Sequence, residues 1–197
     1  MVPDALSSDI VGTLNEVIDR DLAENQVFWF EREDGRSRLN VHILAAQLEM
    51  DATMRPSSLL PLLEAIMGSE LCAEEHSVRI RIPNPDGRLY CRWHRDASHM
   101  EPDVPYRTRY ISVVYYLTDV DESAHTFSVI PGSAQTAELP PLEHYDLETA
   151  HHVEGRAGTA ILLNAAMVHA GKVRRTPSLT TDQFRCLWAT ELPLKRS

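Results

Sequence analysis

Residues 77–94, SVRIRIPNPDGRLYCRWH, mark the point where the chain changes to β-structure. Residues 77–83 alternate between polar and apolar side chains, PNPDG is a cluster of turn-forming residues, and RLYCRWH begins a second extended run. Further β-branched and aromatic runs follow at residues 109–120, 125–133, 158–164 and 183–192. Because these runs are short and no long helical pattern separates them, the sequence predicts an antiparallel sandwich or barrel.

The segment before this point, 1–76, has a helical pattern that is interrupted by two ambiguous stretches. The helix nearer the β core is predicted in SSLLPLLEAIMG (57–68), with Pro61 in its first turn and Gly68 just beyond its end. VFWF (27–30) and NVHILAAQLEM (40–50) fit a strand or a helix equally well, and both readings stay open. The first helix is predicted by apolar residues at helical spacing behind a capping cluster at residues 7–9, namely Ile10, Leu14, Val17, Ile18 and Leu22.

The composition limits the classes of protein to which the chain can belong. With 197 residues and 43% hydrophobic content, it fits one domain, 1–197, with a mostly helical flank at 1–76 and a β core at 77–191. The net charge of −10 and the lack of a basic run argue against a nucleic-acid partner. No stretch resembles a signal peptide or approaches the roughly 18 apolar residues of a membrane helix, so we expect a cytoplasmic protein without a membrane partner. Three cysteines without metal spacing are expected to be reduced, namely Cys72, Cys91 and Cys186.

The segment YCRWHRDASHM (90–100) places His94 and Asp96 at positions i and i+2. In a strand, residues i and i+2 point to the same face, so both side chains could reach one ion while Arg95 points away. Two imidazoles and one carboxylate on one face of an octahedron are typical of non-haem Fe(II) oxygenases. His169, at the end of the apolar run AILLNAAMVH, is the natural third ligand. The alternative, surface histidines near a strand end, stays open at this point.

A second pair, His144 and Asp146, has the same spacing and follows two prolines in a polar loop at residues 137–152. This pair lies only a short way before His169 in the sequence, whereas a much longer stretch separates Asp96 from His169. Only the earlier pair leaves room for several strands before the third ligand, so His94 and Asp96 are preferred.

Arginines in two predicted strands also need an interpretation. Arg185 lies in the apolar run QFRCLW, where an unpaired guanidinium would be expensive to bury. Its anion could be one carboxylate of a dicarboxylate cosubstrate that chelates iron at its other end. The local sequence by itself favours an internal salt bridge to one of the 29 acidic residues. Arg79 and Arg81 share one face of residues 77–83, and a solvated sheet face is favoured there over contact with an acidic substrate.

Five motifs, one of them made of two neighbouring segments, together resemble, in the right order, the phytanoyl-CoA dioxygenase-like branch of the Fe(II)/2-oxoglutarate oxygenases. The resemblance covers about residues 57–190. PLLEAIMGSEL resembles the helix before the core, and WHRDASHM resembles the Trp-His-x-Asp segment. YISVVYYLTDVDES and FSVIPGSAQ resemble two strands around an acidic turn. AGTAILLNAAMVHAG resembles the glycine-led strand with the distal histidine, and FRCLW resembles the arginine-bearing last strand.

The resemblance implies a mainly β (α+β) fold, a double-stranded β-helix or jelly-roll with N-terminal flanking helices. It implies Fe(II) ligands His94, Asp96 and His169, and 2-oxoglutarate as cosubstrate, anchored by Arg185 with a further contact from Thr126. The family usually places its arginine closer to the distal histidine than Arg185 lies to His169 in this sequence. Arg174 and Arg175 therefore remain alternative anchors.

The implied reaction is oxidation of a small-molecule C–H bond by O2 and 2-oxoglutarate, with hydroxylation as the default outcome. Asp96 argues against halogenation, because related halogenases have a small residue at that position. We expect His99, Met100 and either Tyr116 or Tyr115, whichever faces inward, to line the substrate pocket. We expect the substrate to be a secondary metabolite, lipid or amino-acid derivative. The short chain suggests the hypothesis of a homodimer that completes the substrate cover. Two alternatives stay open: a non-catalytic metal-binding jelly-roll, and a metal enzyme that does not use 2-oxoglutarate.

Overall fold

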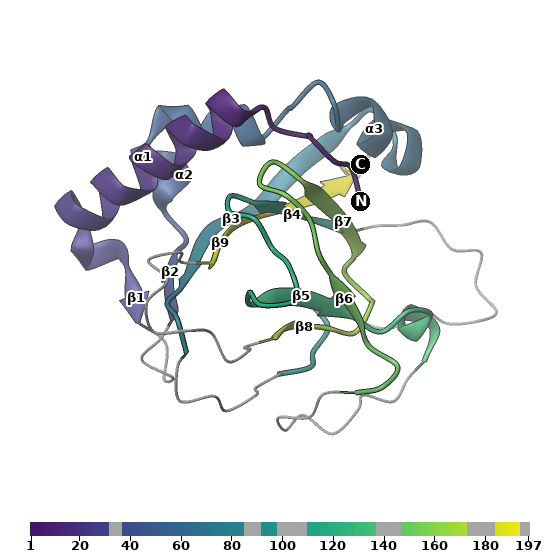
Figure 1. The fold of residues 1–197 in the computed structure, drawn as a ribbon. Helices are drawn as coiled ribbons and strands as arrows, with labels where there is room; N and C mark the ends of the chain where they lie inside the picture. The colour runs from purple at the N-terminus through teal and green to yellow at the C-terminus, as the bar shows by residue number, and fades with distance from the viewer. Residues whose placement is uncertain (32–36, 85–91, 98–109, 137–146, 173–183, 194–197) are drawn as a thin grey trace.

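The computed structural model describes residues 1–31, 37–84, 92–97, 110–136, 147–172 and 184–193. Two antiparallel sheets face one another, and helices from the N-terminal part of the chain cover the outer side of the larger sheet (Figure 1). This arrangement confirms the predicted mainly β jelly-roll with N-terminal flanking helices.

Within the described residues, the larger sheet has six strands in the order β1-β2-β3-β9-β4-β7, and the smaller sheet has three in the order β6-β5-β8. An isolated bridge between His94 and His169 adds the segment carrying the first histidine to the edge of β8. The strands are β1 (Phe30–Glu31), β2 (Ser37–Asn40), β3 (Leu71–Arg81), β4 (Ile111–Tyr116), β5 (Thr126–Val129), β6 (His151–Val153), β7 (Ala160–Asn164), β8 (His169–Lys172) and β9 (Phe184–Pro193).

Three details of the strands differ from the expectations. β3 begins at Leu71, earlier than the alternating pattern indicates, and β6 lies at the end of the segment expected to be a loop. The apolar run before His169 is split into β7 and β8 by a turn at Asn164. The side-chain oxygen of Asn164 accepts the N–H of Ala166 at 3.0 Å, and its carbonyl accepts the N–H of Met167 at 2.8 Å. An asparagine that bonds its own backbone in this way ends a strand, whatever the hydropathy around it.

The two predicted helices form close to their predicted ranges, although no side chain caps the N-terminus of the second one. α1 (Ser8–Glu24) begins after Ser7, whose Oγ accepts the N–H of Ile10 at 3.3 Å, and α3 (Leu60–Met67) ends at Gly68, with φ +96°. The ambiguous stretches become short turns and ends of strands around α2 (Ile43–Ala46), η1 (Gln26–Phe28) and η2 (Leu48–Thr53). Among the described helices, none is both long and apolar enough to cross a membrane.

Strand β4 shows how the two sides of the larger sheet are used. All of its residues are buried. Ile111, Val113 and Tyr115 join the apolar cluster that includes α1, whereas Val114 and Tyr116 join a second cluster between the sheets. The larger sheet is therefore covered on one side by helices and on the other by the smaller sheet, and polar side chains on its inner side lie inside the jelly-roll.

Candidate metal centre

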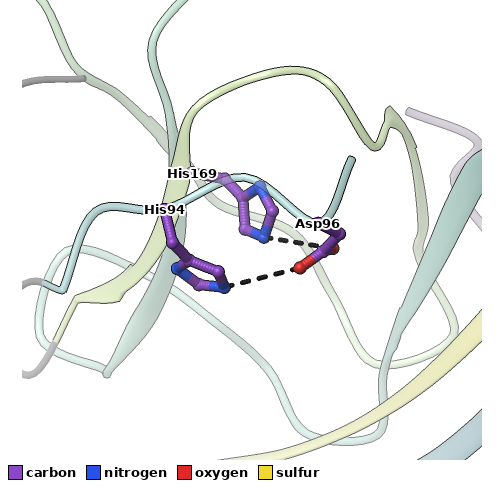
Figure 2. Close-up of side chains that lie close together, drawn as sticks. All are labelled: His94, Asp96 and His169. Atoms are coloured by element: carbon purple, nitrogen blue, oxygen red, sulfur yellow. Dashed lines mark ion pairs between the residues drawn. The ribbon is translucent and has the colours of Figure 1, made fainter. Parts of the chain in front are cut away.

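The side chains of His94, Asp96 and His169 converge between the two sheets, as Figure 2 shows. Nε2 of His94 lies 3.6 Å from Oδ1 of Asp96, and Nε2 of His169 lies 3.4 Å from Oδ2 of the same carboxylate. One donor atom from each residue falls within 4.8 Å of the other two. The structure therefore brings together the three residues that the sequence predicts as metal ligands.

Backbone hydrogen bonds hold these ligands in place. The N–H of His94 donates to the carbonyl of His169 at 3.0 Å, and the reverse bond measures 2.9 Å. The N–H of Asp96 donates to the carbonyl of Ala165, in the turn before β8, at 3.0 Å. Between the two ligands of this segment, Arg95 points away and donates to the carbonyls of Ser133 and Thr136. The i and i+2 side chains thus share one face, as predicted for an extended segment.

Both histidines form the same kind of hydrogen bond through Nδ1. Nδ1 of His169 lies 2.9 Å from the carbonyl of Met167, and Nδ1 of His94 lies 3.0 Å from the carbonyl of Arg92. Because a carbonyl can only accept, each Nδ1 carries a proton, and Nε2 of each ring points toward Asp96. This is the arrangement by which proteins orient histidine toward a metal ion.

Burial keeps the inner histidine neutral. Its side chain is 1% exposed, and this burial, reinforced by the nearby His94 and Arg79, lowers the pKa of His169 to about 3. Partial burial raises the pKa of Asp96, and three neighbouring groups oppose this rise: His94, Arg79 and the hydroxyl of Ser112, which lies 3.5 Å from Oδ2.

The three donors fit a divalent metal ion. Bonds of about 2.1 Å place neighbouring octahedral ligands about 3 Å apart, close to the separations of 3.4 and 3.6 Å seen here. His94 and Asp96 are 43% and 26% exposed, so the site is open on the side of these two residues. The ligand set of two imidazoles and one carboxylate leaves other coordination positions for small molecules.

The structure does not bring Arg185 to this site. Its Nη2 donates to Oδ1 of Asp19 at 2.7 Å, and its Nη1 donates to the side chain and carbonyl of Asn15 at 3.3 and 3.4 Å. Both partners belong to α1, on the helix-covered side of the larger sheet. The neighbouring residue Cys186 packs in the cluster between the sheets. The guanidinium therefore makes the internal salt bridge that the local sequence favours.

The structure also places two other residues that were predicted to contact the cosubstrate or the substrate, Thr126 and Tyr116. The hydroxyl of Thr126 donates to the carbonyl of Val153 at 2.6 Å, on the opposite side of β5 from Phe127, whose ring lies 5.4 Å from that of His169. The structure thus does not bring Thr126 to the triad. Tyr116 does face the space between the sheets, but its hydroxyl donates to the carbonyl of Val153 at 2.7 Å. Besides Cys91, six of the candidate ligand and contact residues named from the sequence lie outside the described part of the chain: His99, Met100, His144, Asp146, Arg174 and Arg175.

Two arginines that the sequence analysis assigned to a solvated face lie inside the jelly-roll. Val78 and Ile80 pack in the cluster that includes the helices, so Arg79 and Arg81 face the smaller sheet. Arg79 is near enough to Asp96 and His169 to lower the pKa of each. The alternation in residues 77–83 correctly indicates a strand with one polar and one apolar face. In the structure, the polar face points toward the smaller sheet. The expectation of a solvated face was therefore wrong.

Comparisons with known proteins give the family and the fold of the chain. Residues 2–180 match the family model of phytanoyl-CoA dioxygenase (PhyH). No curated protein matches the sequence. Among solved structures, HygX from Streptomyces hygroscopicus, with nickel, 2-oxoglutarate and hygromycin B bound, has a TM-score of 0.73 and 18% identity, covering 98% of this chain and 81% of that one.

Two further similar structures come from nogalamycin biosynthesis. The epimerase SnoN, in complex with Fe3+, alpha ketoglutarate and nogalamycin RO, has a TM-score of 0.72 and 17% identity, with coverage of 98% and 77%. The carbocyclase SnoK, a non-heme alpha ketoglutarate dependent enzyme, has a TM-score of 0.73 and 15% identity, with coverage of 98% and 78%. At these identities the likeness establishes the fold.

Proposed function

Because the chain belongs to the phytanoyl-CoA dioxygenase (PhyH) family of 2-oxoglutarate-dependent non-haem iron oxygenases, we propose that it oxidises a C–H bond of a small molecule. His94, Asp96 and His169 would hold the Fe(II). The single observation that carries the proposal is the convergence of two imidazole Nε2 atoms on one carboxylate, at 3.6 and 3.4 Å.

With both groups bound, Fe(II) and 2-oxoglutarate supply the oxidising power: one oxygen atom of O2 enters succinate, CO2 leaves, and the other oxygen atom converts the substrate C–H bond to C–OH. The residues of the chain contribute orientation. The Nδ1–H bonds of both histidines fix the two rings, and the hydroxyl of Ser112 lies 3.5 Å from the carboxylate of Asp96. The ring of Phe127 packs beside His169 and keeps water from that side of the site.

The substrate class is proposed from the open side of the site and from the similar structures. HygX binds hygromycin B and SnoN binds nogalamycin RO, so this fold accommodates natural products beside a metal. We propose a natural product of secondary metabolism as substrate, entering beside the partly exposed His94. Because SnoN is an epimerase and SnoK a carbocyclase, product analysis has to decide between hydroxylation and another outcome of C–H oxidation.

A homodimer that completes the substrate cover remains a proposal. The chain covers 77 to 81% of the length of the three similar structures named above, so parts of those chains have no counterpart in the residues compared. Light scattering combined with size-exclusion chromatography tests this point. A homogeneous species with the mass of a single chain would rule the homodimer out.

The experiment that tests the function is succinate formation from 2-oxoglutarate by the Fe(II)-loaded protein in air. Many oxygenases of this kind convert 2-oxoglutarate slowly without substrate, so the assay does not need the substrate to be known. We expect succinate in the wild type and none in His169→Ala, with His151→Ala as the control at an exposed histidine. Fe(II) binding without 2-oxoglutarate binding or succinate in the wild type would instead support a non-catalytic or 2-oxoglutarate-independent metal protein.

A further inference from the structure

Two arginines on the inner side of β3 concentrate positive charge beside the triad. We infer that Arg79 and Arg81 bind the two carboxylates of 2-oxoglutarate, in place of the arginine expected on the last strand. The inference rests on the proposed function and assigns residues to it.

On the last strand, β9, the described residue that faces the space between the sheets is Cys186, which is not a cation. Arg185 is 13% exposed and has its guanidinium 2.7 Å from Asp19, on the helix-covered side. The next residue, Cys186, faces the interior, and its burial raises the pKa of the thiol to about 11, so the thiol is neutral at physiological pH. An anion bound between the sheets therefore needs a cationic side chain from another strand.

Arg79 lies next to this position on the neighbouring strand. It pairs with Cys186 across β3 and β9, and both residues face the smaller sheet. It shares the inner face of β3 with Arg81, which reaches the strand that carries His169, and its charge acts on both Asp96 and His169, so its guanidinium lies on the metal side of the interior. A carboxylate bound to the metal ion would meet Arg79 first.

Arg81 reaches the smaller sheet from position i+2 relative to Arg79 on β3. A Cβ added to Gly171 would lie 3.3 Å from Nη2 of Arg81 and 3.8 Å from its Nε. Gly171 is on β8, the same strand as His169, and its φ lies outside the left-handed region. The backbone therefore does not require glycine there, and what the missing side chain provides is space for the Arg81 guanidinium between the sheets.

The spacing of the two arginines suits a five-carbon dicarboxylate. Residues i and i+2 of a strand are roughly 7 Å apart, and four carbon–carbon bonds place the two carboxylates of 2-oxoglutarate roughly 5 Å apart. A guanidinium can hold a carboxylate through two parallel hydrogen bonds. Arg79, nearer the triad, would hold the carboxylate at the metal, and Arg81 would hold the distal one.

The test measures binding rather than turnover. Mn(II)-loaded protein is titrated without air by calorimetry, once with 2-oxoglutarate and once with 2-oxobutanoate, which lacks the distal carboxylate. We expect Arg81→Met to weaken 2-oxoglutarate binding roughly 10- to 100-fold and to leave 2-oxobutanoate binding nearly unchanged. Arg79→Met should weaken both ligands. Arg185→Met is the matched control and should leave both affinities within about twofold of the wild type.

Mn(II) affinity, measured by electron paramagnetic resonance, checks that each variant keeps the metal site. Arg81→Lys is a second variant in case Arg81→Met fails to fold, and it should bind 2-oxoglutarate with intermediate affinity, because it keeps the charge and loses the planar fork. Unchanged 2-oxoglutarate affinity in the Arg79 and Arg81 variants, with a large loss in Arg185→Met, would overturn the inference and leave the proposed function intact. A wild type that binds Mn(II) but not 2-oxoglutarate would overturn both.

Discussion

His94 and His169 form two backbone hydrogen bonds with one another, of 3.0 and 2.9 Å, although they lie far apart along the chain. Their ring centroids lie 4.4 Å apart. The sheet itself therefore sets the distance between the two imidazoles, and no flexible loop has to close for them to meet. A site built on paired backbone is preorganised for its ligand.

Replacing Gly158 tests a close approach between the N-terminal segment and the sheet. Gly158 has φ +92°, and an added Cβ would lie 2.4 Å from the carbonyl oxygen of Leu6. We expect Gly158→Ala to lower the free energy of unfolding by about 2 kcal/mol or more, from backbone strain plus the clash. Chemical denaturation measures this change. Gly12→Ala in α1, where nothing lies within 4 Å, should instead stabilise the protein by about 0.5–1 kcal/mol.

Asp21 connects α1 to three other segments through a buried carboxylate. It accepts hydrogen bonds from Trp29 Nε1 at 2.8 Å and from the side-chain amides of Asn25, Asn40 and Gln47 at 2.9 Å. Asp21→Ala leaves these donors without their acceptor, and we expect a loss of about 3 kcal/mol or more in unfolding free energy. Glu16→Ala, at an exposed position of the same helix, is the control and should change it by less than about 0.5 kcal/mol.

His76 should make stability depend on pH away from the metal site. Burial lowers the pKa of His76 to about 4 from 6.5, so the unfolded chain takes up this proton first as the pH falls. The stabilisation is complete above pH 6.5 and is lost progressively toward pH 4, by up to about 1.4 kcal/mol per pH unit. Denaturation of His76→Leu should show a flatter pH dependence in this window. An identical slope in the variant and the wild type would contradict the assignment.

The pair Arg185–Asp19 should contribute to stability and not to ligand binding. Asp19 is 59% exposed, so solvent screens the interaction, and a double-mutant cycle with Arg185→Met and Asp19→Ala should give a coupling of about 0.5–1 kcal/mol. Zero coupling would show that the contact at 2.7 Å has no energetic role.

The sequence predicted the parts of the fold and site that depend on local periodicity. Alternation identified β3, capping residues identified α1, and the i, i+2 spacing of His94 and Asp96 correctly placed both on one face. The apolar run that ends at His169 also indicated the third ligand, although the structure splits this run into two strands and places His169 at the start of β8.

The side of the sheet that each arginine faces could not be predicted in the same way. Both sides of the larger sheet are covered, one by helices and the other by the smaller sheet, so a polar face no longer indicates solvent. Arg79 and Arg81 therefore lie inside, against expectation. For Arg185, the local sequence favoured a salt bridge and the family resemblance favoured a cosubstrate anchor. Only the three-dimensional position of Asp19 on α1 decides between them.

The most direct test of the central claim is an anaerobic titration of the metal-free protein with Fe(II) and then 2-oxoglutarate, monitored by the visible charge-transfer band of the chelate. We predict a band that saturates at one Fe(II) per chain in the wild type and is absent in Asp96→Ala and His169→Ala, because both variants lose a metal ligand. Tight Fe(II) binding by the wild type without any band on addition of 2-oxoglutarate would contradict the account.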